Sequence, residues 1–317
     1  MTWNHLADSR LGAMSYLSRL FADMEARNPI AFPDFSGQPG LILASDYSGF
    51  HQGAKFDVSA FVLIDVSSFY AWNPARRQAR DNFLPDGRRI SFKGLRDGKQ
   101  REFLPRFLSM ASHLRGIVAV FATDHSVGSL FTPDDDLSYS QWLFRQRWQA
   151  SVGERVLRVS HFASFLLAGL SHAGQNVFWF TDQDEIAPNE QRLDDFTTVW
   201  ANVLTHYLQD RHSLAHIRCG TTLSDDGSRE IEDLASIADL AAGATAEYLT
   251  AATNHSVLPL TSEMSPMPPN ISPKTYALHD WLSYEAAPLR RVVVTIARHT
   301  DGKSLAFRHL RTQWSES

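Results

Sequence analysis

The strongest constraint on the fold is an apolar stretch of strand length that ends in an aspartate, and this pattern occurs three times. The stretches cover residues 41–46, 117–124 and 177–182, and they end in Asp46, Asp124 and Asp182. A strand that is apolar on both faces belongs inside a covered sheet. Ligands of α/β folds bind at the carboxyl ends of such strands. If the three strands are neighbours, their carboxylates converge at one edge of the sheet.

The first stretch continues as Asp46-Tyr47-Ser48-Gly49, and two interpretations of it remain open. Gly49 permits a tight turn. In the simpler interpretation this is a polar turn in which Asp46 hydrogen-bonds to its own backbone. In the other, Asp46 belongs to an acidic site.

A fourth acidic residue lies on a helix expected from about 230 to 252. One stripe of this helix carries Glu232, Ser236, Asp239 and Gly243, which follow each other at helical spacing. Small neighbouring residues allow a close approach to a sheet: Ala238, Ala241, Ala242 and Ala246. The alternative is an ordinary amphipathic helix. Clustered carboxylates stay ionised only beside a cation, and Mg²⁺ or Mn²⁺ suits such oxygen ligands.

The remaining pattern predicts an α/β protein. Helices are expected over 8–27, 99–114, 138–170 with a break near Gly153, 193–208 and 275–284. Strands are expected over 56–66 and 69–72, forming a meander with the first stretch, and over 214–219. A terminal hairpin of 291–298 and 304–309 surrounds Asp301-Gly302. Asp134-Asp135-Asp136 is expected to cap a helix.

Composition limits the classes of protein that remain. The chain has 317 residues, enough for one large domain or a domain with additions. Its single cysteine, Cys219, excludes an internal disulfide and a Cys-rich zinc site, and it is expected in the core. No basic and apolar leader segment or membrane-length apolar run occurs, so we expect a cytoplasmic protein without a membrane partner.

Charge is unevenly distributed along the chain. Residues 75–101 carry nine basic and three acidic side chains, although the whole chain has a formal charge of −5. Such a local basic patch suits a polyanion, and the alternative is a solvated surface. The candidate nucleic-acid-binding residues are Arg76, Arg77, Arg88, Arg89, Lys93, Arg96 and Lys99.

The order of these elements resembles the ribonuclease-H-like superfamily. Within this superfamily, the chain is most similar to an uncharacterised group whose members share four short motifs. In this chain the motifs are Asp46-Tyr47-Ser48-Gly49, Lys93-Gly94, Asp182, and Ala238-Asp239-Leu240-Ala241-Ala242-Gly243. The resemblance covers about residues 40–250. Tyr47 departs from it, because the group commonly has an acid there. Only Glu102 could match the acid that many superfamily nucleases carry on their first helix.

The resemblance implies a ribonuclease-H-like mixed sheet, with an antiparallel three-strand meander plus parallel strands, flanked by helices. The implied division is an N-terminal helical extension (1–39), the ribonuclease-H-like domain (40–255), and a C-terminal connector, helix and hairpin packed on the core (256–317).

The implied activity is a metal-dependent nuclease that uses two divalent cations, Mg²⁺ or Mn²⁺. Asp46 would bridge the cations, with Asp124 or Asp182 and Asp239 completing the sites. Asp184 or Glu232 could substitute for one of these ligands. Lys93 or a nearby arginine would neutralise the substrate phosphate. The implied partner is a nucleic acid of unknown type.

Two other functions remain open at this stage. A catalytically inactive module of the same fold could bind nucleic acid or a protein, or form a homo-oligomer through the terminal additions. An actin-like or sugar-kinase-like phosphotransferase shares the core topology, but no Gly-rich phosphate loop follows the Asp46 strand. His125, beside Asp124, could assist as an acid or base or be an ordinary loop histidine, and no histidine has zinc-site spacing.

Overall fold

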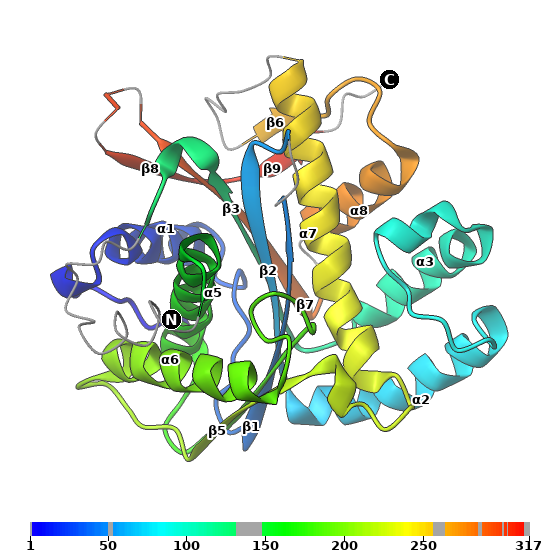
Figure 1. Cartoon of the computed structure of the whole chain (residues 1–317), viewed down its shortest axis with the longest axis horizontal. Helices are drawn as coiled ribbons and strands as arrows, with labels where there is room; N and C mark the ends of the chain where they lie inside the picture. Colours follow the sequence, from blue (N-terminus) through cyan, green and yellow to red (C-terminus); the bar gives the residue numbers. More distant parts are fainter. Residues whose placement is uncertain are drawn as a thin grey trace.

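The computed structural model describes residues 2–49, 53–130, 148–255, 264–284, 287–299, 301–302 and 304–313. Within these ranges the centre is a seven-stranded mixed sheet with the order β5-β4-β1-β2-β3-β7-β8 (Figure 1). Its strands are β1 (Gly40–Ser48), β2 (Phe56–Asp65), β3 (Gly116–Asp124), β4 (Asn176–Thr181), β5 (His216–Thr221), β7 (Leu289–Arg298) and β8 (Leu305–His309). The short strands β6 (Met264–Pro266) and β9 (Arg311–Gln313) form a separate parallel pair.

Strand directions divide the sheet into a meander and parallel additions. β1, β2 and β3 pair antiparallel in sequence order. β4 runs parallel to β1, and β5 runs parallel to β4. On the other side β7 runs parallel to β3, and β8 returns antiparallel to β7. The predicted mixed sheet of antiparallel and parallel strands is therefore confirmed.

Helices cover both faces of the sheet. One layer contains α1 (Ala13–Arg27), α5 (Ala150–Leu170) and α6 (Glu190–Leu208). The other contains α2 (Val66–Phe83), α3 (Gly98–Ala111), α7 (Glu230–Asn254) and α8 (Pro273–Ser283) (Figure 1). Short 3₁₀ turns are η1 (Ser9–Leu11), η2 (Lys93–Arg96), η3 (His125–Val127) and η4 (Thr222–Ser224). None of the described helices has the length and apolarity needed to cross a membrane.

Side chains of β1 alternate between the two layers because successive residues of a strand point to opposite faces. Leu41 and Leu43 enter the core beneath α1, α5 and α6. Ile42 and Ala44 enter the core beneath α7. By this alternation Asp46 belongs to the α7 face.

The predicted strand at 69–72 is wrong, because these residues lie within α2. Asp65 caps this helix by accepting a hydrogen bond from the backbone N–H of Ser68. Phe69 and Trp72 are both buried at helical spacing, so tertiary burial outweighs the strand preference of aromatic residues. β3 is the third strand of the meander instead.

The C-terminal segment contains the predicted hairpin, because β8 pairs antiparallel with β7, and this hairpin extends the central sheet. β7 pairs with β3 along residues 116–123, and β8 then pairs with β7. β7 and β8 therefore belong to the same sheet as the strands before residue 255. The helix expected over 138–170 is interrupted at residues 148 and 149, and α5 then continues through Gly153 without a break. The first part of that helix and Asp134-Asp135-Asp136 lie outside the described residues.

Candidate functional site

Three of the predicted acids meet on the α7 face of the sheet. Asp46 lies in β1, and the register that pairs Ser45 with Thr181 in β4 places Asp182 beside it, just after β4. Asp239 projects from α7, which packs across β1 and β2. The negative charges of Asp239 and Asp182 both act on Asp46. The strand-end and helix pattern predicted a convergence of four acids, and these three of them lie on one face of the sheet.

Asp46 is the least compensated carboxylate of this cluster. Burial raises the pKa of Asp46 well above its usual value, and the charge of Asp239 raises it further. The charge of Arg89 opposes this rise in the pKa. Among the described residues, the largest influences on this pKa are burial and neighbouring charges.

Tyr47 points to the opposite face of β1 and takes no part in the cluster. Its hydroxyl lies 2.8 Å from the Ser45 hydroxyl and accepts a hydrogen bond of 3.4 Å from Thr181 Oγ1. Burial raises the pKa of Tyr47. The departure from the resembled motif at this position therefore leaves the acidic residues on the α7 face unchanged.

Asp239 is anchored by a chain segment and not by the sheet. Its Oδ2 accepts a hydrogen bond of 2.5 Å from the backbone N–H of Phe92. One turn earlier, the Ser236 hydroxyl donates to the carbonyl of Ile90 at 2.7 Å. One turn later, a Cβ on Gly243 would lie 2.4 Å from the ring of Phe92. The small-residue stripe of α7 thus receives residues 90–94, which include the Lys93-Gly94 motif.

The pKa of Asp239 is raised above its usual value, as is the pKa of Asp46. Burial raises the pKa of Asp239, while the Phe92 N–H and the charge of Arg89 lower it. Asp182 adds to the rise by repulsion. Asp46 and Asp239 are therefore two acids whose ionised forms lack full compensation.

Asp182 differs because both of its oxygens are engaged. Its Oδ2 accepts a hydrogen bond from Arg89 Nη1 at 2.7 Å, within an ion pair. Its Oδ1 accepts from Thr222 Oγ1 at 2.8 Å and from the backbone N–H of Gln183 at 3.1 Å. Although burial acts to raise it, Arg89 and these hydrogen bonds hold the pKa of Asp182 below its usual value.

Asp184 lies near the cluster but is turned toward its own loop. Its Oδ1 accepts a hydrogen bond of 2.8 Å from the backbone N–H of Ile186. Burial raises the pKa of Asp184, and the N–H groups of Ile186 and Ala187 oppose this.

Two predicted ligands lie elsewhere. Asp46 is level with Ala60 and Val120, whereas Asp124 pairs with Phe56 at the end of β3. Asp124 is thus four residues, or about 13 Å, further along that strand, and it caps η3 through the N–H of Ser126. Its predicted place in the acidic cluster is therefore wrong.

Glu232 is also separated from the cluster. It lies seven residues before Asp239 on α7, which corresponds to about 10 Å along the helix, and it forms an ion pair with Arg229. Helical spacing predicted that Glu232 and Asp239 share one face of the helix. It could not show that Asp46 and Asp182 lie near Asp239 alone.

The basic segment is largely paired with acids. Arg76 is fully buried, and it and Arg80 each reach a carboxylate oxygen of buried Asp233 at 2.6 Å. Arg76 is therefore unavailable to a polyanion, which corrects its prediction. No sequence pattern indicated this role for Asp233, which follows Glu232 on the same helix.

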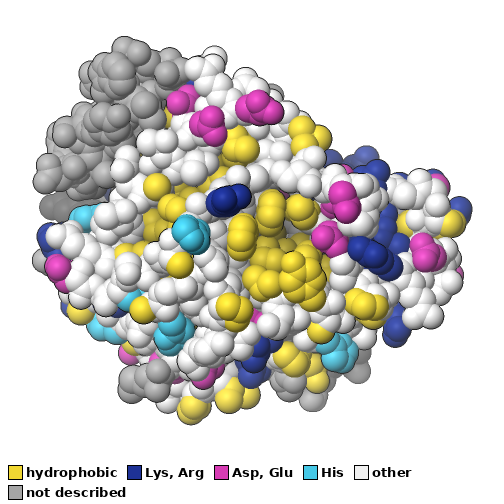
Figure 2. Space-filling model, turned by 90° about the horizontal axis from the view of Figure 1, so that it is seen from below, with side chains coloured by type: hydrophobic (Ala, Val, Ile, Leu, Met, Phe, Trp, Pro, Cys, Tyr) yellow, Lys and Arg dark blue, Asp and Glu magenta, His cyan; other side chains and the backbone are white. Residues whose placement is uncertain are grey.

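The exposed members of this segment form no purely basic surface. Arg88 pairs with Asp86 and Asp97, and Arg77 lies 3.7 Å from Glu230. Figure 2 shows acidic and basic side chains intermixed on the lobe at its right, where α2 and α3 lie. Three further predicted residues are exposed: Lys93, Arg96 and Lys99.

Few of the predicted ligand carboxylates remain for a cation. In the described ranges no three His, Cys, Asp or Glu side chains are grouped so that they could hold a metal ion. Asp182 is committed to Arg89 and Thr222. Asp46 and Asp239 remain, and Mg²⁺ commonly binds to one or two carboxylates while keeping several waters.

No family model matches the chain, and a search of curated proteins also finds no match.

Proposed function

We propose that this chain is a divalent-cation-dependent phosphodiester hydrolase of ribonuclease-H-like fold that acts on nucleic acid. The fold supports this proposal through an antiparallel meander with an Asp in its first strand, two parallel strands beside that strand, and a late helix with Asp239. The observation that carries it is the pair Asp46 and Asp239, whose pKa values are both raised in a cluster with excess negative charge. A cation between them would relieve this repulsion.

A bound Mg²⁺ or Mn²⁺ would supply an activated water and polarise a phosphoryl oxygen. Asp46 and Asp239 would hold it, while Arg89 keeps Asp182 ionised and in place. Lys93 follows Phe92 in the chain, is exposed, and lowers the pKa of Asp239 by its charge. This position suits contact with a substrate phosphate.

A non-catalytic binding module is the second candidate, and Arg89 favours it. Its guanidinium pairs with Asp182, and its charge also acts on Asp46 and Asp239. A fixed internal cation of this kind could replace a metal ion and leave a site that binds without hydrolysing.

Calorimetric titration with Mn²⁺ distinguishes the two candidates. We expect the wild type to bind one ion and both Asp46→Asn and Asp239→Asn to lose this binding. Asp124→Asn is the matched control, because it removes a strand-end carboxylate outside the cluster. If the wild type binds no Mn²⁺ at millimolar concentration with nucleic acid present, the hydrolase proposal fails and the binding module remains.

Cleavage assays with Mg²⁺ or Mn²⁺ on single- and double-stranded DNA and RNA then test the activity. Hydrolysis should depend on the cation and fall by roughly 100-fold or more in Asp46→Asn. Cation binding without hydrolysis of any of the four substrates would contradict the proposed reaction.

A further inference from the structure

The α7 face of the sheet is partly uncovered over β4 and β5. α7 packs mainly across β1 and β2, and β5 is the edge strand of the sheet. Phe178 of β4 points to this face, because it pairs with Ile42 of β1, whose side chain enters the core beneath α7. Phe178 is 36% exposed although β4 is an inner strand. Its exposure therefore comes from an open sheet face and not from a strand edge.

β5 adds a cation to this open face. The parallel register places Arg218 beside Phe178 and Gly220 beside Phe180. Arg218 is exposed and forms no hydrogen bond or ion pair with any described residue. A Cβ on Gly220 would lie 3.0 Å from the ring of Phe180, so this ring lies against the backbone of β5. We call Phe178, Phe180 and Arg218 the aromatic strip.

The aromatic strip extends to the acidic cluster along β4. Phe180 and Phe178 precede Asp182 by two and four residues, so Phe178 is about 13 Å from Asp182 along the strand. At the end of β5 the hydroxyl of Thr222 donates to Asp182 at 2.8 Å. Leu223, the next residue, is 70% exposed. The surface beside the acidic cluster is therefore apolar and open.

Exposed cations lie at both ends of this surface. Arg218 is beside Phe178, and Lys93 lies near enough to Asp239 for its charge to lower the pKa of that carboxyl. Single-stranded nucleic acids bind where aromatic rings stack with bases and cations contact the backbone phosphates. Bases in a duplex are already stacked on one another, so only unpaired bases present a free face to a protein ring. The open aromatic face thus suits a single strand.

We propose that the aromatic strip binds single-stranded nucleic acid and positions it at the acidic cluster, with a base stacked on Phe178 and a phosphate at Arg218. The substrate class rests on the proposed function, whereas the preference for a single strand follows from the open aromatic face. Stacked bases are about 3.4 Å apart along a strand, so the distance from Phe178 to Asp182 corresponds to about four nucleotides.

Fluorescence anisotropy of a labelled oligothymidylate of about 12 nucleotides tests the strip on the full chain, with a chelator present so that the strand stays intact. The wild type should bind this single strand more tightly than its duplex with oligoadenylate. Phe178→Ala should weaken binding roughly fivefold to 100-fold, and Phe178→Trp should bind as the wild type does because it keeps a stacking ring. Arg218→Gln should weaken binding and lower the salt dependence by about one phosphate contact.

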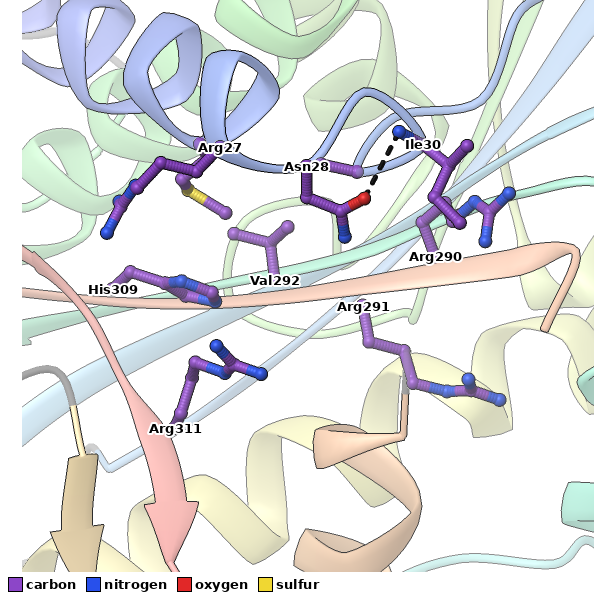
Figure 3. A pocket seen from close by; sticks show the side chains of 10 residues that line it. Arg27, Asn28, Ile30, Arg290, Arg291, Val292, His309 and Arg311 are labelled. Atoms are coloured by element: carbon purple, nitrogen blue, oxygen red, sulfur yellow. Dashed lines mark hydrogen bonds between the residues drawn. The ribbon is translucent and has the colours of Figure 1, made fainter. Parts of the chain in front are cut away.

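Ile30→Ala and Arg106→Gln are the matched controls. Ile30 is an exposed apolar residue at the opposite edge of the sheet, beside a cavity of about 490 Å³ between the end of α1 and β7 (Figure 3). Arg106 is an exposed arginine of α3. Both variants should bind the strand as the wild type does. Thermal melting checks that every variant folds, and Arg218→Gln keeps the test open if Phe178→Ala misfolds.

The proposal is overturned if the wild type does not prefer the single strand, or if folded Phe178→Ala or Arg218→Gln binds it with wild-type affinity. Its failure differs from failure of the hydrolase, because Mn²⁺ titration reports on the acidic cluster alone. Cation-dependent cleavage with unchanged strand binding in Phe178→Ala would keep the hydrolase and reject the strip. Strand binding that depends on Phe178 in a protein that binds no Mn²⁺ would keep the strip and reject the hydrolase.

Discussion

Asp46 and Tyr47 are neighbours in β1, but their side chains lie on opposite faces of the sheet. Asp46 faces a carboxylate cluster beneath α7, while the Tyr47 hydroxyl is hydrogen-bonded within the other layer. Neutralising Asp46 should therefore relieve repulsion, whereas truncating Tyr47 should remove packing. The acidic cluster is an intrinsic cost to folding in the absence of a bound cation.

At neutral pH and with metal chelated, we expect Asp46→Asn to be more stable than the wild type by about 1 kcal/mol or more. Burial raises the pKa of Asp46 in the folded protein, so the ionised carboxylate lowers the free energy of unfolding at neutral pH. This loss of stability begins as the pH rises through the raised pKa, and it is absent below the ordinary pKa of 3.8, where the carboxyl is protonated. The advantage of the variant should thus shrink on acidification. Melting curves across this pH range measure it, with Asp124→Asn as control. A variant less stable at neutral pH would show that Asp46 makes a stabilising contact.

Residue types and strand ends were enough to predict three members of the cluster, Asp46, Asp182 and Asp239. Sequence could not exclude Asp124, because its displacement depends on the β2–β3 register. It also could not assign Arg89 to Asp182, a pair separated by 93 positions. Local patterns carry no information about which long side chain will reach across such a distance.

Among the elements, α7 has the most specific packing. Its stripe of Ser236, Asp239 and Gly243 holds the segment containing Ile90 and Phe92, so the position of Asp239 depends on how closely Phe92 can approach. Helix periodicity predicted the stripe, but the predicted contact was with the sheet. The strand expected at 69–72 failed for a related reason, since aromatic side chains suit a buried helix face as well as a strand.

Gly243→Ala should destabilise the protein by about 1–3 kcal/mol, because the added Cβ would lie 2.4 Å from the Phe92 ring. Displacing Phe92 should also weaken its hydrogen bond to Asp239 and reduce Mn²⁺ affinity. Denaturant unfolding and calorimetry measure the two effects. Gly98→Ala is the control, because a Cβ there meets nothing within 4 Å. Equal stability of both variants would contradict the close packing described here.

At the scale of the whole molecule, residues after 255 complete the fold. β7 buries Val292, Val294 and Ile296 beneath the α1 layer, and α8 buries Leu278 and Leu282 against α7 and its neighbours. Sequence predicted the C-terminal strands but could not place them in the sheet, because pairing partners are set by long-range contacts.

A chain truncated after residue 255 should therefore fail to fold cooperatively, since it leaves β3 with an uncovered edge. We expect it to be insoluble or to lack a sharp thermal transition, whereas the full chain should show one. Circular dichroism and thermal melting of the two proteins test this. A stable, cooperatively melting 1–255 fragment would show that the core is independent of its C-terminal strands.

The position of β7 between β3 and β8 also has a consequence for synthesis on the ribosome. β3 leaves the exit tunnel long before its partner β7 has been translated. The interval between the synthesis of α1 and that of β8, which α1 contacts, is longer still. Until then the nascent chain presents an open strand edge, which is a template for aggregation. We therefore expect the unfinished chain to aggregate more readily than the complete protein.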